Sequence, residues 1–470
     1  MREPEGHGRT AMTLWNESKL TLRLALPLMI GQLSQMLLGV ADTVMIGRLG
    51  VTELAALTFA SALFHVPFVF GIGVLTGVSV VSANAFGAGD SSGARASCRH
   101  GLKLGLLTGA VLAALGWLVS GHLGLFGQPP EVVERSPVFF RILMLSLIPA
   151  LASIALKNHA DALQRPWPPF WIFLGGVLLN IALNWVMIYG KLGCPRLGLE
   201  GAAWATLIAR TVILVVVFGW LNRATSLAEW VPRRWWRAPT MVTTRRVLAI
   251  GVPASAQMFF EVTAFSVAAL LVGRFGATAM AAHQVALTIA SLSFMVPLGM
   301  AMALTVRIGE ANGAGERRRF RPITVSGWLL CSLYAMLAAA VMIGFGEPIA
   351  AAFSKDAGVI SLAAMLLAIV GIFQVADGLQ VASCSMLRGL HDARVPALMG
   401  FASYWVIGLP AAALLAFHTP LGPRGVWWGL ALGLVTAACT MGPRLWRRIG
   451  RVGLTQDPSA DEPAAGQARR

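Results

Sequence analysis

Charged residues are scarce in this chain of 470 residues. Asp, Glu, Lys and Arg make up 12% of it, whereas hydrophobic residues make up 56%. A soluble globular protein carries about 25% charged residues, because its folded surface must be hydrated. The shortage excludes a water-soluble protein, and the high apolar content excludes collagen-like and disordered chains. We therefore expect an all-α polytopic membrane protein.

Cysteine is also scarce, and no cysteine spacing indicates a metal site. The five cysteines are odd in number and far apart, and no two of them form a CxxC pair. This distribution excludes a disulfide scaffold and a structural zinc site. We expect no cofactor.

Long apolar stretches dominate the rest of the chain. A helix needs about 20 apolar residues to cross the ~30 Å hydrocarbon core of a bilayer. The first stretch is too long for a signal peptide, so we expect it to be a retained helix. Twelve stretches qualify: 20–46, 54–82, 101–120, 138–158, 168–190, 198–221, 247–272, 280–307, 324–344, 358–383, 396–417 and 424–442.

The basic residues are distributed unevenly between the two ends of these spans. The N-terminus, the loops after even-numbered spans and the C-terminus hold 28 of the 37 Lys and Arg residues. Loops after odd-numbered spans hold eight, and Arg210 lies inside the sixth span. Basic residues accumulate on the cytoplasmic side of membrane helices. The pattern predicts a bacterial inner-membrane protein with both termini in the cytoplasm. It also explains the net charge of +16 without a nucleic-acid partner.

The sequence repeats itself at an offset of 226 residues. Residues 47–50 (Gly-Arg-Leu-Gly) match 273–276 (Gly-Arg-Phe-Gly), and residues 87–90 match 313–316. An offset of six spans gives both halves the same orientation. We therefore predict two six-helix lobes related by a parallel repeat, with a pseudo-two-fold axis along the membrane normal. Such an arrangement leaves a central cleft and favours a carrier over a channel.

The repeat and the charge pattern together predict five segments and a monomeric protein. Pro27 and Pro253 occupy matching places in the first span of each lobe. An interior proline bends a helix, so these two are hinge candidates, with a static kink as the alternative. The segments are a cytoplasmic N-terminal segment (1–19), an N-lobe (20–221), a basic, Trp-rich cytoplasmic connector (222–246), a C-lobe (247–442), and a cytoplasmic tail (443–470) that is first basic and then disordered.

Three acidic residues lie inside spans and beyond the first helical turn: Asp42, Glu261 and Asp377. An ionised carboxylate near the bilayer centre costs about 2.5–3.5 kcal/mol. The three cannot all be neutralised by Arg210, the one base that we expect to be buried. A buried carboxyl group can exchange a proton near neutral pH or stay ionised by binding Na⁺. We expect these acids to couple transport to H⁺ or Na⁺, with a possible Na⁺ site at any of them.

Polar residues in the N-lobe accompany Asp42. Asn180 and Asn184 are four residues apart, hence on one face of the fifth span, and Thr206 lies on the next span. Their oxygens suit a hydrogen-bond relay or a cation site, with ordinary helix–helix hydrogen bonding as the alternative. Glu261 lies seven residues, or about two helical turns, from the position that repeats Asp42. A single symmetric ion site is therefore not expected.

These residues carry a family resemblance. Residues 41–48 (Ala-Asp-Thr-Val-Met-Ile-Gly-Arg), the seventh span with its proline followed by Glu261, and residues 373–380 resemble the multidrug and toxic compound extrusion (MATE) family. The Leu-Arg-Gly at 387–389 is also typical of it. The resemblance covers residues 20–444 and is closest to the NorM-type branch.

The resemblance implies a twelve-helix antiporter that expels organic, often cationic, compounds against inward H⁺ or Na⁺. Some NorM-type members have Tyr where this chain has Phe373, so a hydroxyl ligand for Na⁺ is missing there. Carried over by position, the N-lobe site comprises Asp42, Asn180, Asn184 and Thr206, and the C-lobe site comprises Glu261 and Asp377.

We therefore expect a secondary active multidrug exporter in the lipid bilayer that works by alternating access. The alternative is a flippase for a lipid-linked precursor, which would need a cleft lined with basic residues, whereas Arg210 alone is central. An enzyme is not expected, because the sequence contains no HExxH, paired catalytic carboxylates or nucleophile motif. No GxxxxGK[ST] phosphate loop is present either, so ATP is not the energy source.

Overall fold

The computed structural model describes residues 5–237 and 240–454, and every element in these ranges is helical. Twelve helical segments in the described ranges are long and apolar enough to cross a membrane, so the predicted number of spans is confirmed. The spans are α1 (Glu5–Gly47), α2 (Val51–Gly87), α3 (Ser91–Ser120), α4 (Pro130–Leu145) with α5 (Leu147–Ala162), α6 (Trp167–Tyr189), α7 (Leu199–Arg223), α8 (Met241–Gly273), α9 (Ala277–Gly313), α10 (Phe320–Gly344), α12 (Ala357–Gly389), α13 (Arg394–Phe401) with the π-helix η4 (Ala402–Gly408) and α14 (Leu409–Phe417), and α15 (Pro423–Leu454). Short helices between the spans are η1 (Leu123–Phe126), η2 (Thr225–Leu227), η3 (Arg317–Arg319) and α11 (Gly346–Ala351).

Several helices differ from their predicted bounds. The predicted fourth span is interrupted at Ser146, between α4 and α5. The N-terminal segment is helical from Glu5, and α15 continues to Leu454 through the basic part of the tail. Helices continue beyond the apolar stretches because Glu, Lys and Arg are good helix formers. Residues 455–470, predicted to be disordered, lie outside the described residues.

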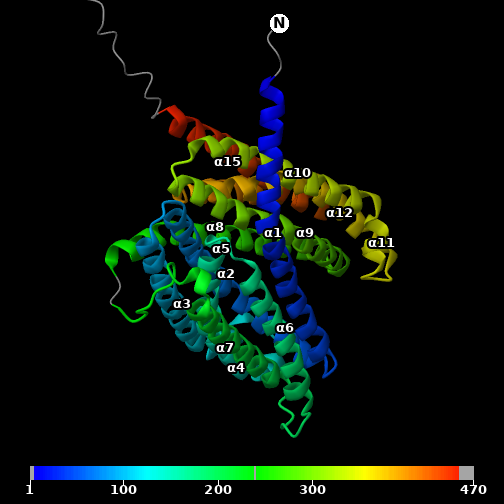
Figure 1. Ribbon diagram of the computed structural model, residues 1–470. Coiled ribbons are helices and arrows are strands. Elements are labelled where there is room, and N and C mark those ends of the chain that lie inside the picture. The colour runs from blue at the N-terminus through cyan, green and yellow to red at the C-terminus, as the bar shows by residue number, and fades with distance from the viewer. Residues whose placement is uncertain (1–4, 238–239, 455–470) are drawn as a thin grey trace, which may run out of the picture.

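The helices form two bundles that meet along α1, α2, α8 and α9. Figure 1 shows α2 to α7 in the lower bundle and α9 to α15 in the upper one, with α1 running across both. Between the bundles, α1 contacts α9 and α10, and α2 contacts α8 and α9. We call the lower bundle the N-lobe and the upper bundle the C-lobe.

Helix α1 belongs to both lobes. Midway along it, Leu28 packs in one apolar cluster with Met300 and other C-lobe residues, and nearer its start Glu17 pairs with Arg307 of α9. At its other end, Ile46 is buried in an N-lobe cluster. The first helix of the N-lobe therefore begins against the C-lobe and ends within its own lobe.

Helix α8 repeats this arrangement in the opposite sense. Near its start, Val247 packs with Val78 of the N-lobe, whereas Ala268 is buried in a C-lobe cluster. Pro27 and Pro253 lie in the half of each helix that packs on the other lobe. A proline removes one backbone hydrogen bond of the helix, so a change in bend there would move one lobe relative to the other.

The lobes pack most closely at one end, which we call the connector face. It comprises the C-terminal ends of α2 and α9, together with the connector between α7 and α8. A Cβ atom on Gly87 would lie 1.9 Å from the carbonyl oxygen of Glu310, and one on Gly313 would lie 1.9 Å from that of Asn84. Both the glycines and the carbonyl residues are 226 positions apart. The contact is thus reciprocal, as a pseudo-two-fold axis between the lobes requires.

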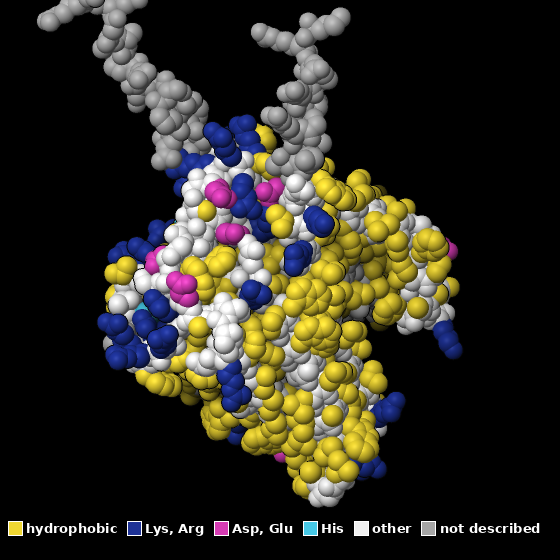
Figure 2. All heavy atoms as spheres, in the orientation of Figure 1, with side chains coloured by type: hydrophobic (Ala, Val, Ile, Leu, Met, Phe, Trp, Pro, Cys, Tyr) yellow, Lys and Arg dark blue, Asp and Glu magenta, His cyan; other side chains and the backbone are white. Residues whose placement is uncertain are grey.

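Similar close contacts continue into the membrane-spanning part. A Cβ atom on Gly251 of α8 would lie 2.0 Å from the carbonyl oxygen of Val74 on α2, and one on Gly77 would lie 2.2 Å from that of Val247. Small residues allow helices in a membrane to approach this closely. Away from the connector face the lobes diverge, and Figure 2 shows a hollow between them on the right of the view.

We predict that Gly251→Val disrupts the contact between the lobes, because the new side chain has no space against the α2 backbone. Overpacking of this kind costs about 1–3 kcal/mol. The variant should unfold at a lower temperature in detergent and show longer distances between spin labels on the connector-face ends of α2 and α9. Gly219→Val is the matched control, since a Cβ atom there meets nothing within 4 Å. Equal effects of the two substitutions would contradict the prediction.

Candidate functional site

In the N-lobe, the four predicted polar residues form one hydrogen-bonded chain. Asn184 Nδ2 donates to Asp42 Oδ1 at 2.5 Å and to Asn180 Oδ1 at 3.1 Å. Asn180 Nδ2 donates to Thr206 Oγ1 at 3.2 Å, and the Thr206 hydroxyl donates to the carbonyl oxygen of Ala202. Both asparagines are buried on α6, so they hold the carboxyl group of Asp42, on α1, in a defined position.

Arg210 lies near this chain without forming an ion pair with Asp42. Its guanidinium donates to Ser146 Oγ at 2.6 Å and lies over the rings of Phe64 and Phe68, at 5.0 and 5.2 Å. The two opposite charges interact at longer range, but the ion pairs among the described residues do not include Asp42. The Asp42 carboxylate therefore has no permanent ion-pair partner among the described residues.

The C-lobe acids lie on α8 and α12. Asp377 is 8% exposed, and the charge of Glu261 is close enough to act on it. Arg388, about three turns further along α12, acts electrostatically on Glu261. The expectation that Arg210 is the one buried base was wrong, because Arg307 and Arg388 are buried, whereas Arg210 is half-buried. Arg388 was missed because α12 continues beyond the predicted end of its span, and Arg307 was missed because it is the last residue of the predicted span 280–307.

Around Asp377, buried polar atoms lack hydrogen-bond partners. Among the described residues, Asp377 Oδ1, Tyr404 Oη, Trp427 Nε1 and both ring nitrogens of His283 have none. Tyr404 is close enough to Glu261 and Asp377 for their charges to act on it, and the His283 and Trp427 rings lie 5.3 Å apart. Buried polar groups are normally paired with protein or water. This group, the C-lobe polar cluster (Glu261, His283, Asp377, Tyr404 and Trp427), is therefore equipped to bind water, a cation or a polar ligand.

Tyr404 was not predicted as a site residue. It lies on the π-helix η4, and π-helical turns are frequent at functional sites. Phe373 stacks on Trp427 with ring centroids 6.2 Å apart, so the position that carries Tyr in some NorM-type proteins is apolar here. Tyr404 offers a hydroxyl group from a neighbouring helix instead. The sequence offered one signal for it: Tyr404 is one of only three tyrosines in the chain and lies inside a predicted span.

The structure does not join the two lobes' acids. No hydrogen bond or ion pair in the described part of the chain connects Asp42 with Glu261 or Asp377. The candidate site therefore has two parts, one in each lobe, as the displaced positions in the repeat predicted.

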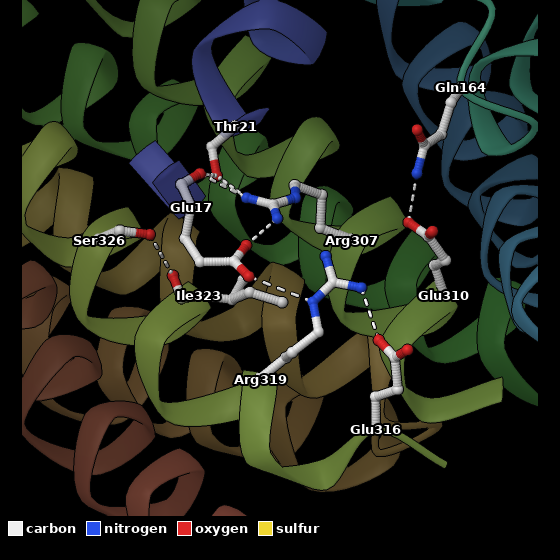
Figure 3. Close-up of polar contacts among 9 residues, drawn as sticks. All are labelled: Glu17, Thr21, Gln164, Arg307, Glu310, Glu316, Arg319, Ile323 and Ser326. Carbon is white, nitrogen blue, oxygen red and sulfur yellow. Dashed lines mark hydrogen bonds and ion pairs between the residues drawn. The ribbon is translucent and has the colours of Figure 1, made fainter. Parts of the chain in front are cut away.

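A third polar group was missed altogether and joins the lobes at the connector face. We call Glu17, Thr21, Arg307 and Arg319 the interlobe ion cluster (Figure 3). Arg307 of α9 pairs with the Glu17 carboxylate and donates to the Glu17 carbonyl oxygen at 2.6 Å and to Thr21 Oγ1 at 2.5 Å. Arg319 Nε donates to the other carboxylate oxygen of Glu17 at 3.2 Å.

The interlobe ion cluster is shielded from water. The side chains of Glu17 and Arg307 are 9% and 3% exposed. A second polar link lies beside it, where Gln164 Nε2 of the N-lobe donates to Glu310 Oε2 at 2.5 Å (Figure 3). Glu17 had been assigned to the polar N-terminal segment. Its place one helical turn before Thr21, at the start of an apolar helix, was the available signal.

Comparisons with known proteins agree with this architecture. The MatE family model matches residues 27–186 and again residues 253–414, and the two matches begin 226 residues apart. The chain is 36% identical to the multidrug resistance protein PmpM of Pseudomonas aeruginosa, over 93% of this chain and 92% of that protein. It is 34% identical to a probable multidrug resistance protein NorM of Rhizobium meliloti, over 92% and 94%.

Solved structures show the same fold. The crystal structure of a variant of the Vibrio cholerae MATE transporter VcmN superposes with a TM-score of 0.86 at 22% sequence identity, covering 94% of this chain and 98% of that one. The relatives named above are transporters and not enzymes. With two lobes built on the predicted repeat and matched by one family model, the chain belongs to the MATE family of multidrug transporters.

Proposed function

We propose that this protein is a secondary active exporter that exchanges organic, mostly cationic compounds for inward-moving H⁺ or Na⁺. Membership of the family supports multidrug export. The observation that carries the exchange mechanism is the Asp42 carboxylate, which accepts a hydrogen bond from buried Asn184 yet has no ion-pair partner among the described residues. Such a group can gain a proton or a cation without first breaking a salt bridge.

The arrangement of the lobes supports alternating access. We propose that both termini and the connector face lie in the cytoplasm, as the distribution of basic residues indicates. The lobes are closed at that face and diverge at the other, so the structure represents an outward-open state. Transport then requires the connector face to open and the opposite face to close.

Neutralisation of the acids inside the spans would drive this exchange. H⁺ or Na⁺ entering from outside occupies Asp42, Glu261 or Asp377, and the loss of negative charge weakens the hold on a cationic compound. The compound leaves, the lobes reorient, and a new compound on the cytoplasmic side displaces the ion. Each ligand biases the same two-state equilibrium, as reciprocal coupling requires.

Helix α1 links the ion site to the interlobe contact. It carries Glu17 in the interlobe ion cluster, Pro27 in the half packed on the C-lobe, and Asp42 in the N-lobe site. A change in the bond between Asp42 and Asn184 can therefore shift one end of a helix whose other end holds the connector face closed. We propose Pro27, and Pro253 by symmetry, as the hinges of this motion.

The two lobes offer different sites to the coupling ion. No group of three or more His, Cys, Asp or Glu side chains converges within the described ranges, so a bound Na⁺ would combine carboxylates with neutral oxygens. In the N-lobe, Asn184 Oδ1 is buried without a partner beside Asp42. In the C-lobe, the Tyr404 hydroxyl is available near Glu261 and Asp377.

Export of drugs is favoured over flipping of a lipid-linked precursor. The relatives above are named for multidrug resistance. The additional buried bases do not form a basic lining between the lobes: Arg307 pairs with Glu17, and Arg388 lies at the end of α12. We propose that the exporter acts as a monomer in the bacterial inner membrane.

Asp42→Asn should abolish ion-driven efflux, because an amide cannot exchange a proton or offer a charged ligand to Na⁺. We expect normal expression and an uptake of fluorescent cation by inverted vesicles that no longer depends on the ion gradient. Asp90→Asn is the matched control, since Asp90 caps α3 by accepting from Gly93 N and Asn caps equally well. Efflux by Asp42→Asn at the wild-type rate would refute the coupling role.

The coupling ion can be identified in proteoliposomes with independently imposed gradients of Na⁺ and H⁺. We expect one of the two gradients, without ATP, to drive the movement of a fluorescent cation, and to be dissipated as the cation moves. Transport that persists with neither gradient present would contradict secondary antiport.

Glu17→Gln should open the connector face, because it leaves Arg307 buried and unpaired. Removing one partner of a buried ion pair costs about 3–5 kcal/mol, enough to change the ratio of the two states at least about 100-fold. Double electron–electron resonance should show longer distances between spin labels on the connector-face ends of α2 and α9. The control is Glu316→Gln, which removes an exposed carboxylate paired with the same Arg319. An unchanged distance distribution in Glu17→Gln would show that this pair does not hold the face closed.

A further inference from the structure

The connector between α7 and α8 has an apolar inner side that is fixed to the N-lobe. Leu227, Val231 and Trp235 are buried in one cluster with residues of α3 and α7. Hydrogen bonds hold the backbone in place: Trp230 O contacts His159 Nε2 at 3.2 Å, and Arg237 O accepts from Lys103 Nζ at 2.6 Å. The connector up to Arg237 is therefore packed on the N-lobe as part of its surface.

The outer side of the connector is strongly basic. Arg233, Arg234 and Arg237 are exposed, and together with Trp235 and Trp236 they line an open recess of about 640 Å³. Lys and Arg side chains gather on the left of Figure 2, where Figure 1 draws the connector after α7. The surface thus concentrates positive charge on one place of the connector face.

Arg99 of α3 adds a fourth guanidinium group to this surface. It is close enough to Arg237 for the two positive charges to repel each other, and its Nε is buried without a hydrogen-bond partner among the described residues. The ion pairs in the described ranges include neither Arg99 nor the three connector arginines. The positive charge of this surface is therefore not balanced by an ion pair within the described residues. An anion bound there would be attracted electrostatically by all four guanidinium groups.

The position of the surface indicates where such an anion comes from. Trp236 is 82% exposed, and Met241 and Val242, at the start of the α8 span, are 79% and 64% exposed. Large apolar side chains at the end of a membrane span face lipid, and tryptophan is enriched at the level of the headgroups. The arginines and these apolar side chains therefore occupy the boundary between headgroups and acyl chains.

We propose that Arg99, Arg233, Arg234 and Arg237, with Trp236 beside them, form a binding site for the phosphate group of an anionic phospholipid in the leaflet at the connector face. Guanidinium groups bind phosphate through paired N–H donors, and each basic residue near an anionic leaflet contributes attraction. Trp236, Met241 and Val242 contact the acyl chains of the same lipid. This combination favours a membrane lipid over a soluble phosphate or a nucleic acid, because neither of these has acyl chains that could contact the apolar side chains.

Native mass spectrometry of the full chain, titrated with phosphatidylglycerol and separately with phosphatidylcholine, tests the site. The wild type should retain one phosphatidylglycerol more tightly than any phosphatidylcholine. Arg233→Gln/Arg234→Gln/Arg237→Gln should bind phosphatidylglycerol about 100-fold more weakly, because each arginine near an anionic surface is worth about 1 kcal/mol. Arg318→Gln/Arg447→Gln/Arg448→Gln is the matched control, because it removes three exposed charges from the C-lobe side of the same face.

Thermal unfolding distinguishes lost binding from misfolding, and the unfolding temperature should be the same for both triple variants. If the connector variant does misfold, Trp236→Ala replaces it, and this variant should weaken phosphatidylglycerol binding while leaving the charge intact. Equal loss in the control variant, equal binding of phosphatidylcholine, or displacement of the lipid by soluble glycerol phosphate would each overturn the proposal.

Discussion

The closed connector face depends on direct contact between helix backbones at glycine. Gly87 and Gly313 each face a carbonyl oxygen of the other lobe at a distance that no side chain would permit. Beside these contacts, Glu17 of α1 pairs with Arg307 of α9 and is shielded from water with it. A buried ion pair of this kind stabilises a structure only while both partners and their hydrogen bonds are in place. In the proposed mechanism, backbone contact and ion pair break together when the connector face opens.

Exchange of the first helices between lobes explains how such an event can respond to a distant ion. Helix α1 begins against the C-lobe, ends in the N-lobe and carries Asp42 near that end. Helix α8 does the reverse and carries Glu261. In the proposed mechanism, a charge change at either acid acts on a helix that is already part of the interlobe contact. No further chain of side chains is needed to transmit it.

The sequence predicts the features that depend on apolar periodicity and on the free-energy cost of polar groups in a membrane. Twelve spans follow from the lengths of the apolar runs, and the lobes follow from the repeat. The polar chain from Asp42 to Thr206 follows from polar residues inside membrane spans, where such residues are energetically unfavourable. The interlobe ion cluster was out of reach, because Glu17 looks like any charged residue in a solvated segment until the lobes are packed. The break at Ser146 was missed for a similar reason: it lies inside an uninterrupted apolar run, where only tertiary packing sets the bend.

The hydrogen bonding around the acidic residues differs between the two lobes. In the N-lobe, Asp42 ends a chain of hydrogen bonds that continues through two buried asparagines to Thr206, so its carboxyl group is positioned before any ion arrives, and Asn184 Oδ1 is the one oxygen of this hydrogen-bonded chain that is buried without a partner. In the C-lobe, Asp377 and Tyr404 have buried polar atoms without partners, so the surroundings are completed only by something that enters. A preorganised carboxyl group suits a small, frequent exchange such as a proton, whereas an incomplete polar cluster suits a hydrated cation or a drug. Under the proposed function, the divergence of the repeat in its acids divides the work between lobes that otherwise share one fold.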